Sequence, residues 1–262
     1  MEFARDCPFY TCPMAGRAVK TEAVVLRSLR FGEADRVLHL YTESRGRLGA
    51  IAKGVRRTRS RFGGRLEPLS HVALVLHQGS GELATVTGVD LVRSHASARE
   101  EPYRLGVGLV GAEAMLRLFP EQEASPRAFE ALTRFLDLLD ELEPSSAGPP
   151  HLDALGLSFQ LKLLWLAGYL PHVGSCANCG GPAPFAGYSA PAGGVVCRTC
   201  ADAGGTLALS AAGLSGIEGL LRRPLAEAGD VGLTVRGARD VLSVVTSSYE
   251  HHGGFRLRTL SA

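Results

Sequence analysis

Thr21–Lys53 reads TEAVVLRSLRFGEADRVLHLYTESRGRLGAIAK, and this stretch decides the fold of the amino-terminal part. It contains three short segments rich in β-branched and aliphatic residues, separated by turn-forming residues at Phe31-Gly32-Glu33 and Ser44-Arg45-Gly46. Short apolar segments bounded in this way are typical of strands joined by tight turns. Two similar segments follow before residue 93. The five predicted strands are Ala23–Leu29, Arg36–Thr42, Leu48–Lys53, Val72–Gln78 and Ala84–Val92.

The last predicted strand changes phase at a glycine. Its apolar residues alternate at Ala84 and Val86, and then shift by one position to Val89 and Leu91 after Gly88. Such a shift indicates a β-bulge. Five short strands without a long helical pattern predict a small barrel, and we expect the five-stranded OB-fold. An SH3-like barrel would show the same pattern.

After Glu100 the sequence becomes helical. Arg127–Leu142 places apolar side chains on one face and charged side chains on the other, which predicts an amphipathic helix. Leu152–Tyr169 is apolar nearly all round, so we expect it at the centre of a helical domain. The other predicted helices are Tyr103–Leu118, Ser210–Arg222 and Arg236–His251, and Glu143–Pro150 is predicted to be a loop.

The predicted fold class is therefore α+β. We expect a tail over residues 1–18, an OB-fold domain over 19–95, and a helical domain over 100–262 with a cysteine-bearing insertion at 174–204. Cys7 and Cys12 fall in the tail, which we predict to be disordered or, if Met14 is the true start, extra.

Charge is divided unevenly along the 262 residues. The net charge is only +2, but residues 20–65 contain 12 Lys or Arg against 4 Asp or Glu, whereas residues 66–262 contain 14 against 20. A basic end on an otherwise acidic protein predicts a polyanion-binding site.

No apolar run has the length and low charge of a membrane span. Residues 1–13 hold Arg5 and Asp6 without an apolar core, so we expect no secretory signal and a cytoplasmic protein.

Four of the six cysteines form two C-x2-C knuckles, Cys176 with Cys179 and Cys197 with Cys200. In a reducing compartment cysteines are expected to be thiols or metal ligands, and this spacing is typical of a tetrahedral Zn²⁺ site. Four thiolates leave no open position for water, so we predict one structural zinc ion per chain. His172 is an alternative ligand, and the alternatives to a metal site are a redox pair or a coincidental spacing of the cysteines.

Positive residues without an intervening acidic residue fill the predicted connection between the third and fourth strands. Guanidinium groups bind phosphate oxygens and stack on bases, so this connection predicts a nucleic-acid site, with a merely solvated loop as the alternative. Single-stranded DNA is favoured because no groove-reading helix is evident. Phe31, Tyr41 and Phe62 are the aromatic side chains available for stacking, or else for the core. The predicted DNA-binding residues are Arg36, Arg45, Arg47, Lys53, Arg56, Arg57, Arg59, Arg61 and Arg65.

The order of several motifs resembles one known family, the bacterial recombination mediator and DNA repair protein RecO. The resemblance covers about residues 18–220. The motifs are Thr21-Glu22-Ala23-Val24-Val25-Leu26-Arg27, Phe31-Gly32-Glu33-Ala34-Asp35-Arg36-Val37, Gly46-Arg47-Leu48, Lys53-Gly54-Val55-Arg56-Arg57, Ser60-Arg61, Leu66-Glu67-Pro68, Leu163-Leu164 and Gly168-Tyr169-Leu170-Pro171, leading into Cys176-x2-Cys179-Gly180.

The resemblance implies an OB-fold, a helical domain and a zinc-finger-like insertion, the last not universal in the family. It also implies binding of single-stranded and double-stranded DNA, and annealing of complementary strands. Cooperation with RecR, and often RecF, would load RecA onto DNA coated by single-stranded DNA-binding protein. We therefore expect a non-enzymatic mediator associated with the nucleoid. The alternatives are a zinc-ribbon adaptor in transcription or RNA handling and a zinc-dependent hydrolase or nuclease.

Overall fold

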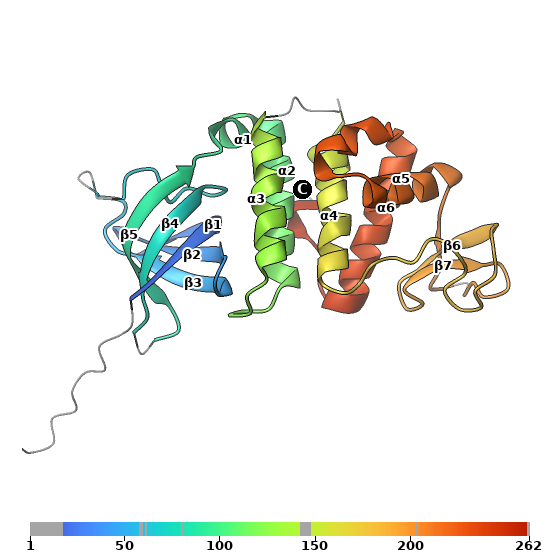
Figure 1. The fold of residues 1–262 in the computed structure, drawn as a ribbon, viewed down its shortest axis with the longest axis horizontal. Coiled ribbons are helices and arrows are strands. Elements are labelled where there is room, and N and C mark those ends of the chain that lie inside the picture. Colours follow the sequence, from blue (N-terminus) through green and yellow to red (C-terminus); the bar gives the residue numbers. More distant parts are fainter. Residues whose placement is uncertain are drawn as a thin grey trace, which may run out of the picture.

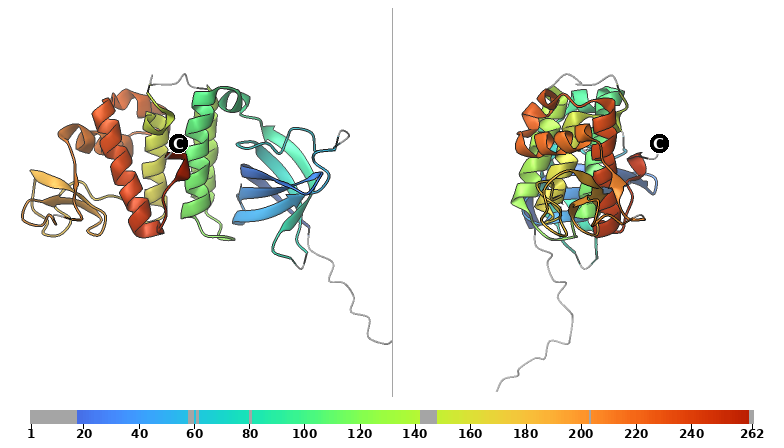
Figure 2. Two further views of the ribbon diagram at one scale, coloured as in Figure 1. Left: turned by 180° about the vertical axis from the view of Figure 1, so that it is seen from behind. Right: turned by 90° about the vertical axis from the view of Figure 1, so that its right-hand side faces the viewer.

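The computed structural model describes residues 18–260, except for 58–59, 61, 80, 142–147 and 203. Three parts follow one another along its longest axis (Figure 1). A five-stranded β-structure lies at one end, a helical body lies in the middle, and a small sheet that carries the cysteines lies at the other end (Figure 2). Cys7, Cys12, Met14, Arg59 and Arg61 lie outside the described residues.

The five predicted strands are present, and they pair in a cycle. β1 pairs with both β2 and β4, and β3 pairs with both β2 and β5. Because β4 also pairs with β5, the order β1-β2-β3-β5-β4 closes as a barrel. The bounds are β1 (Ala18–Phe31), β2 (Asp35–Thr42), β3 (Gly46–Ala52), β4 (His71–His77) and β5 (Ala84–Arg93).

Strand β1 buries side chains on both of its faces. Ala23 and Val25 belong to the apolar cluster inside the barrel, whereas Val24 and Leu26 belong to the cluster formed by the helices. The register of β1 against β2 shifts between Val25 and Arg27, which leaves Leu26 without a partner in that ladder. The amino-terminal half of β1 pairs with β4 and the remainder with β2. This double pairing makes the strand longer than the predicted Ala23–Leu29.

The predicted bulge in β5 is confirmed. Val75 pairs with Gly88 and Leu76 pairs with Val86, so Thr87 is the extra residue. The Thr87 hydroxyl donates a hydrogen bond of 3.0 Å to the carbonyl of Val75. The glycine next to the bulge allows close packing, because a Cβ there would lie only 3.2 Å from the Val75 side chain.

Six α-helices are described. α2 and α3 stand beside the barrel, α4 lies next to them, and α5 and α6 lie on the far side of α4 (Figure 1). Amphipathic α3 packs its apolar face into the body, as predicted, and the Phe135 ring stacks on Phe159 of α4 with ring centroids 4.1 Å apart. The bounds are α1 (Ala96–Glu100), α2 (Pro102–Leu118), α3 (Pro126–Glu141), α4 (Ala154–Leu166), α5 (Ala211–Arg222) and α6 (Val235–Ser248).

Helix α4 is the centre of the helical body, as its apolar character predicts, but it is shorter than the predicted Leu152–Tyr169. Asp153 caps its start by accepting the N–H of Gly156 at 3.0 Å. At the other end Gly168 adopts φ +85°, a left-handed conformation that stops the helix. Similarly, α6 ends at Ser248, and Tyr249–Gly253 continues as a π-helical turn rather than as α-helix.

The cysteine-bearing part is a three-stranded sheet in the order β7-β6-β8. Its strands are β6 (Phe185–Ser189), β7 (Gly194–Cys197) and β8 (Leu207–Ala208). Short 3-10 helices complete the described chain, at Pro150–Leu152, Leu225–Val231 and Arg258–Leu260. Among the described residues, none of the helices combines the length and apolar character needed to cross a bilayer.

Candidate metal centre and nucleic-acid interface

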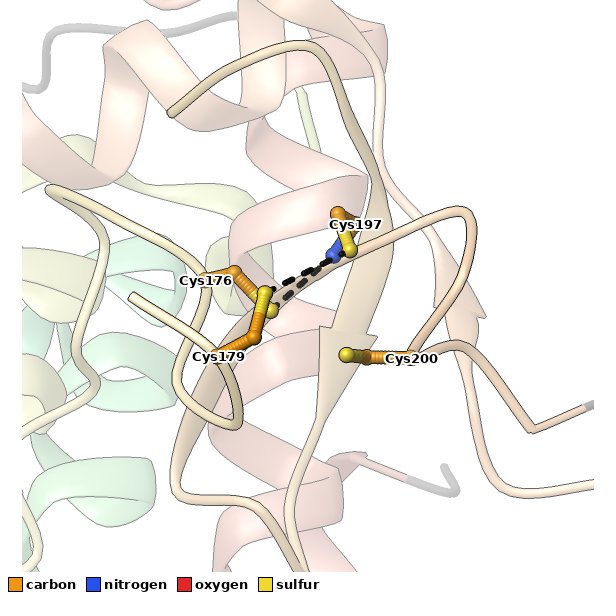
Figure 3. Close-up of side chains that lie close together, drawn as sticks. All are labelled: Cys176, Cys179, Cys197 and Cys200. Carbon is orange, nitrogen blue, oxygen red and sulfur yellow. Dashed lines mark hydrogen bonds between the residues drawn. The ribbon is translucent and has the colours of Figure 1, made fainter. Parts of the chain in front are cut away.

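The first cysteine knuckle is a turn closed by two backbone hydrogen bonds. The Cys176 N–H donates to the carbonyl of Gly181, and the Gly180 N–H donates to the carbonyl of Cys176, both at 2.8 Å. Gly180 has φ +72°, which a residue without a Cβ adopts at little cost. The turn directs the sulfurs of Cys176 and Cys179 to the same side (Figure 3).

The second knuckle begins at the end of β7. The carbonyl of Cys197 accepts the N–H groups of Cys200 and Ala201 at 3.1 and 2.9 Å. The two knuckles are also joined to each other, because the Cys197 N–H donates to the Cys176 sulfur at 3.3 Å. The sheet therefore holds residues 21 positions apart in the sequence next to each other.

All four cysteine sulfurs lie within 4.8 Å of one another, as the spacing predicts. The sulfurs of Cys179 and Cys197 are 3.8 Å apart. Zn–S bonds of about 2.3 Å in a tetrahedron place the sulfurs about 3.8 Å from one another. The cluster therefore has the donor atoms and the spacing to hold a metal ion, and thiolate donors suit zinc.

Hydrogen bonds act in opposite directions on the cysteines of this site: side-chain hydrogen bonds to Cys179 and Cys197 raise the pKa of Cys200 to about 12, whereas backbone hydrogen bonds favour the ionised form of Cys176. The N–H groups of Cys197 and Cys179 are the main cause that lowers the pKa of Cys176, to about 6. A thiolate at neutral pH is the form that binds metal. The alternative ligand His172 does not join the cluster of sulfurs. Its Nε2 lies 2.8 Å from the Ser175 hydroxyl, and its backbone pairs with Gly194.

Few apolar side chains support the cysteine sheet, and one of them fastens it to the helical body. Tyr188 on β6 is buried, and its hydroxyl lies 2.7 Å from the hydroxyl of Ser248 at the end of α6. Val195 and Val196 of β7 are also buried. The sheet is therefore docked on α6, far from the barrel (Figure 1).

The predicted basic connection is the loop between β3 and β4, and its first described residues lie on the side of the barrel away from the helices (Figure 1), whereas Leu69 near its end packs in the helical cluster. Lys53, Arg56, Arg57 and Arg65 are exposed there. Phe62 and Leu66 of the same loop are buried in the barrel cluster, so the loop is pinned to the core.

The start of this loop is fastened to the turn between β1 and β2. The Arg56 guanidinium donates to the carbonyl of Glu33 at 3.0 Å, and the backbone N–H of Arg56 donates to the carbonyl of Ala34 at 2.9 Å. The N–H of Gly54 donates to the Asp35 carboxylate at 2.7 Å. Exposed cations are therefore held next to the end of β1, where Phe31 is 55% exposed.

Three other predicted contact residues are paired with carboxylates or half-buried. Arg36 forms an ion pair with Glu67 at 3.1 Å, and Arg47 forms one with Glu121 at 3.4 Å. Arg45 lies in the β2–β3 turn, next to Gly46, where an added Cβ would clash with the backbone of Glu123 between α2 and α3. Folding therefore brings carboxylates from distant segments against Arg36 and Arg47, and Arg45 is half-buried in its turn.

Of the three aromatic side chains considered for stacking, two are buried and one is exposed. Tyr41 is buried with its ring edge-on to Phe119, and Phe62 is buried in the barrel, so neither can stack on a base. Phe31 remains available. Its neighbour Arg30 is also exposed, a position that the sequence analysis missed although it lies on the same strand. We call Arg30, Phe31, Lys53, Arg56 and Arg57 the basic end.

Comparison with known proteins covers both halves of the chain. The family described as "Recombination protein O N terminal" matches residues 14–95, and "Recombination protein O C terminal" matches 99–261. The protein named DNA repair protein RecO from Rubrobacter xylanophilus is 40% identical over 183 residues, which cover 69% of this chain and 71% of that protein. The protein of the same name from Anaeromyxobacter sp. is 36% identical over 244 residues, 91% of this chain and 93% of that protein.

Proposed function

This chain belongs to the RecO family of DNA repair and recombination proteins, and we propose that it is a non-enzymatic mediator that binds and anneals single-stranded DNA. In this proposal it helps to load recombinase onto DNA in the RecF pathway. Its partners would be single-stranded and double-stranded DNA, RecR, single-stranded DNA-binding protein, RecF and RecA. It would act on the nucleoid in the cytoplasm.

The strand pairing supports an OB-fold for residues 19–95 and not an SH3-like barrel. A five-stranded barrel in the order β1-β2-β3-β5-β4 has the arrangement of an OB-fold, including the parallel β3–β5 pair. OB-folds bind oligonucleotides on the β2–β3 face and through loops. The division into this domain, a helical domain over 100–262 and an insertion at 174–204 is part of the same proposal.

The basic end is the observation that carries the proposal. Four exposed cations and one exposed aromatic side chain belong to the end of β1 and to the start of the β3–β4 loop, which the hydrogen bonds of Arg56 hold next to the β1–β2 turn. In this proposal the cations bind phosphates and Phe31 stacks on a base. Arg65, Arg59 and Arg61 belong to the same loop and would add to the electrostatic attraction, whereas Arg36, Arg45 and Arg47 would contribute little because of their neighbours.

Annealing would follow from the electrostatics. A cationic surface reduces the phosphate repulsion between two strands, and contacts made mainly to phosphates leave the base edges free to pair. A surface with one stacking ring should release each strand readily. This property distinguishes an annealing protein from a protein that stores single strands on several aromatic side chains.

The four cysteines would hold one structural zinc ion. With four thiolates around the metal, no position stays open for a water molecule or substrate. The segment between the knuckles contributes few buried apolar side chains, so metal binding would supply part of its folding free energy. We propose that zinc maintains this surface at the far end of the molecule and takes no part in chemistry.

The test is annealing of complementary oligonucleotides coated with single-stranded DNA-binding protein, monitored by fluorescence energy transfer. The R56E/R57E variant should lose annealing and DNA binding, while R127E/R134E, with the same charge change on the exposed face of α3, should retain both. Circular dichroism would verify that each variant is folded. Full annealing by folded R56E/R57E would contradict the proposal, and tighter binding to RNA than to DNA of the same sequence would favour an RNA adaptor.

A further inference from the structure

A second cationic site lies between the barrel and helix α2, away from the basic end. It is a cavity of about 520 Å³. Arg27, His39 and Arg47 line it from β1, β2 and β3, Arg117 lines it from the last turn of α2, and Arg258 lines it from the carboxy-terminal segment. We call this cavity the interlobe cleft.

The carboxylate that lines the cleft is occupied by other donors. Both oxygens of Glu113 accept backbone N–H groups, from Arg258 at 3.0 Å and from Thr259 at 2.9 Å, and one also accepts the Thr259 hydroxyl at 2.8 Å. Although burial opposes ionisation, these hydrogen bonds lower the pKa of Glu113. Its charge therefore holds the carboxy-terminal segment against α2 and only partly offsets the arginines.

The arginines themselves are incompletely paired. Among the described residues, the side chains of Arg27, Arg117 and Arg258 make no ion pair within 4.0 Å. Arg47 reaches Glu121 at 3.4 Å with one terminal nitrogen, but its Nε is buried without a hydrogen-bond partner. A buried donor without an acceptor is costly, and a bound anion would satisfy it.

The excess of positive charge in the cleft also affects the pKa of His39. Burial, followed by repulsion from Arg27 and Arg47, lowers the pKa of His39, and the opposing attraction of Glu121 is weaker. An anion bound between these arginines would stabilise the imidazolium. The pKa of His39 is therefore a local measure of anion binding in the cleft.

We propose that the interlobe cleft binds the terminal phosphate of a DNA strand. A terminal phosphate carries nearly two negative charges and three acceptor oxygens, which suits several guanidinium groups that approach from different elements. Leu109 and Leu116 of α2 provide an apolar wall on which a sugar or base can lie. The choice of DNA as the source of the phosphate rests on the proposed function, whereas the phosphate site itself does not.

The test uses the zinc-loaded full chain and measures the pKa of His39 by NMR, with the resonance assigned from H39Q. Thymidine 5′-monophosphate should raise this pKa, and thymidine should not. Inorganic phosphate tests the anion alone, and a decathymidylate with or without a 5′-phosphate tests DNA. In R27E/R258E the affinity for thymidine 5′-monophosphate should fall by at least about tenfold, since two charge-assisted contacts are lost. R27Q/R258Q is the milder variant if charge reversal unfolds the chain.

The controls separate the two proposals. R56E/R57E should weaken binding of the oligonucleotide but leave the response of His39 to the mononucleotide unchanged, and R127E/R134E should change neither. If R27E/R258E binds the mononucleotide like the parent, or if the 5′-phosphate makes no difference to the response of His39, the inference is wrong. A larger response to a short acidic peptide than to the mononucleotide would also overturn it, because it would identify the cleft as a peptide site.

Discussion

Replacement of Arg56 and Arg57 by alanine should change the salt dependence of DNA binding by a predictable amount. Both side chains are exposed at the basic end, and Arg56 is held there by backbone hydrogen bonds to the β1–β2 turn. Each cation that neutralises a phosphate of single-stranded DNA contributes about 0.7 to the slope of log K against log salt concentration. Removing two such cations should therefore make the slope shallower by about 1.4.

The corresponding change in affinity is large enough to measure. Between about 50 and 200 mM salt, a difference of about 1.4 in slope means that the parent loses about sevenfold more affinity than the variant. Fluorescence anisotropy with labelled oligothymidylate at five or six salt concentrations gives the slope directly. The difference between parent and variant is independent of Arg59, Arg61 and Arg65, because both proteins retain them.

Two results would refute this reasoning. An unchanged slope in folded R56A/R57A would show that these arginines do not contact phosphates, even if the affinity fell. The same decrease in R127A/R134A would show that the slope reports total charge and not a local surface. Phe31 provides an independent comparison, because F31A should weaken binding without changing the slope.

Three further predictions concern the metal, the core and pH. In metal analysis, C179A should reduce bound zinc from one ion per chain to nearly none. The same variant should leave the salt slope of DNA binding unchanged, because the cysteines and the basic end lie at opposite ends of the molecule. F159A should lower the free energy of unfolding by about 3–5 kcal/mol in urea titrations, since this ring is fully buried against Phe135; a loss below 1 kcal/mol would mean that the helical body repacks. Folding lowers the pKa of His39 from 6.5, so the unfolded chain binds more protons than the folded chain just below pH 6.5. The stability of the fold should therefore decrease as the pH is lowered from 6.5 through the folded pKa. H39Q should show a weaker decrease in melting temperature over the same pH range.

Local patterns in the sequence were enough to predict the elements of the fold. The five strands, the bulge beside Gly88, the amphipathic α3 and the central α4 were all predicted from neighbouring residues, because alternation and helical periodicity reflect which face is buried. Their ends were less well predicted. β1 is longer than predicted because its first half pairs with β4, and the residues of β1 alone do not indicate this pairing.

The clustering of the cysteines was predicted from their spacing alone, since each C-x2-C knuckle brings its own two sulfurs together. The basic surface was only partly foreseen. Glu67 pairs with Arg36 from 31 positions away, and Glu121 pairs with Arg47 from another part of the fold. The interlobe cleft escaped sequence analysis altogether because Arg27, Arg117 and Arg258 are scattered over the whole chain and only folding brings them together.

The β3–β5 pairing has a consequence for how the barrel opens. Only Ala50 with Ala84 and Ile51 with Thr85 are paired there, whereas β2 and β3 are paired along their whole length. Transient unzipping of the barrel should therefore begin at this seam, and the amides around it should exchange with solvent earlier than those of the β1–β2 ladder. The seam immediately precedes the arginine-rich loop, so a bound strand that tightened this loop would slow the exchange of the seam as well.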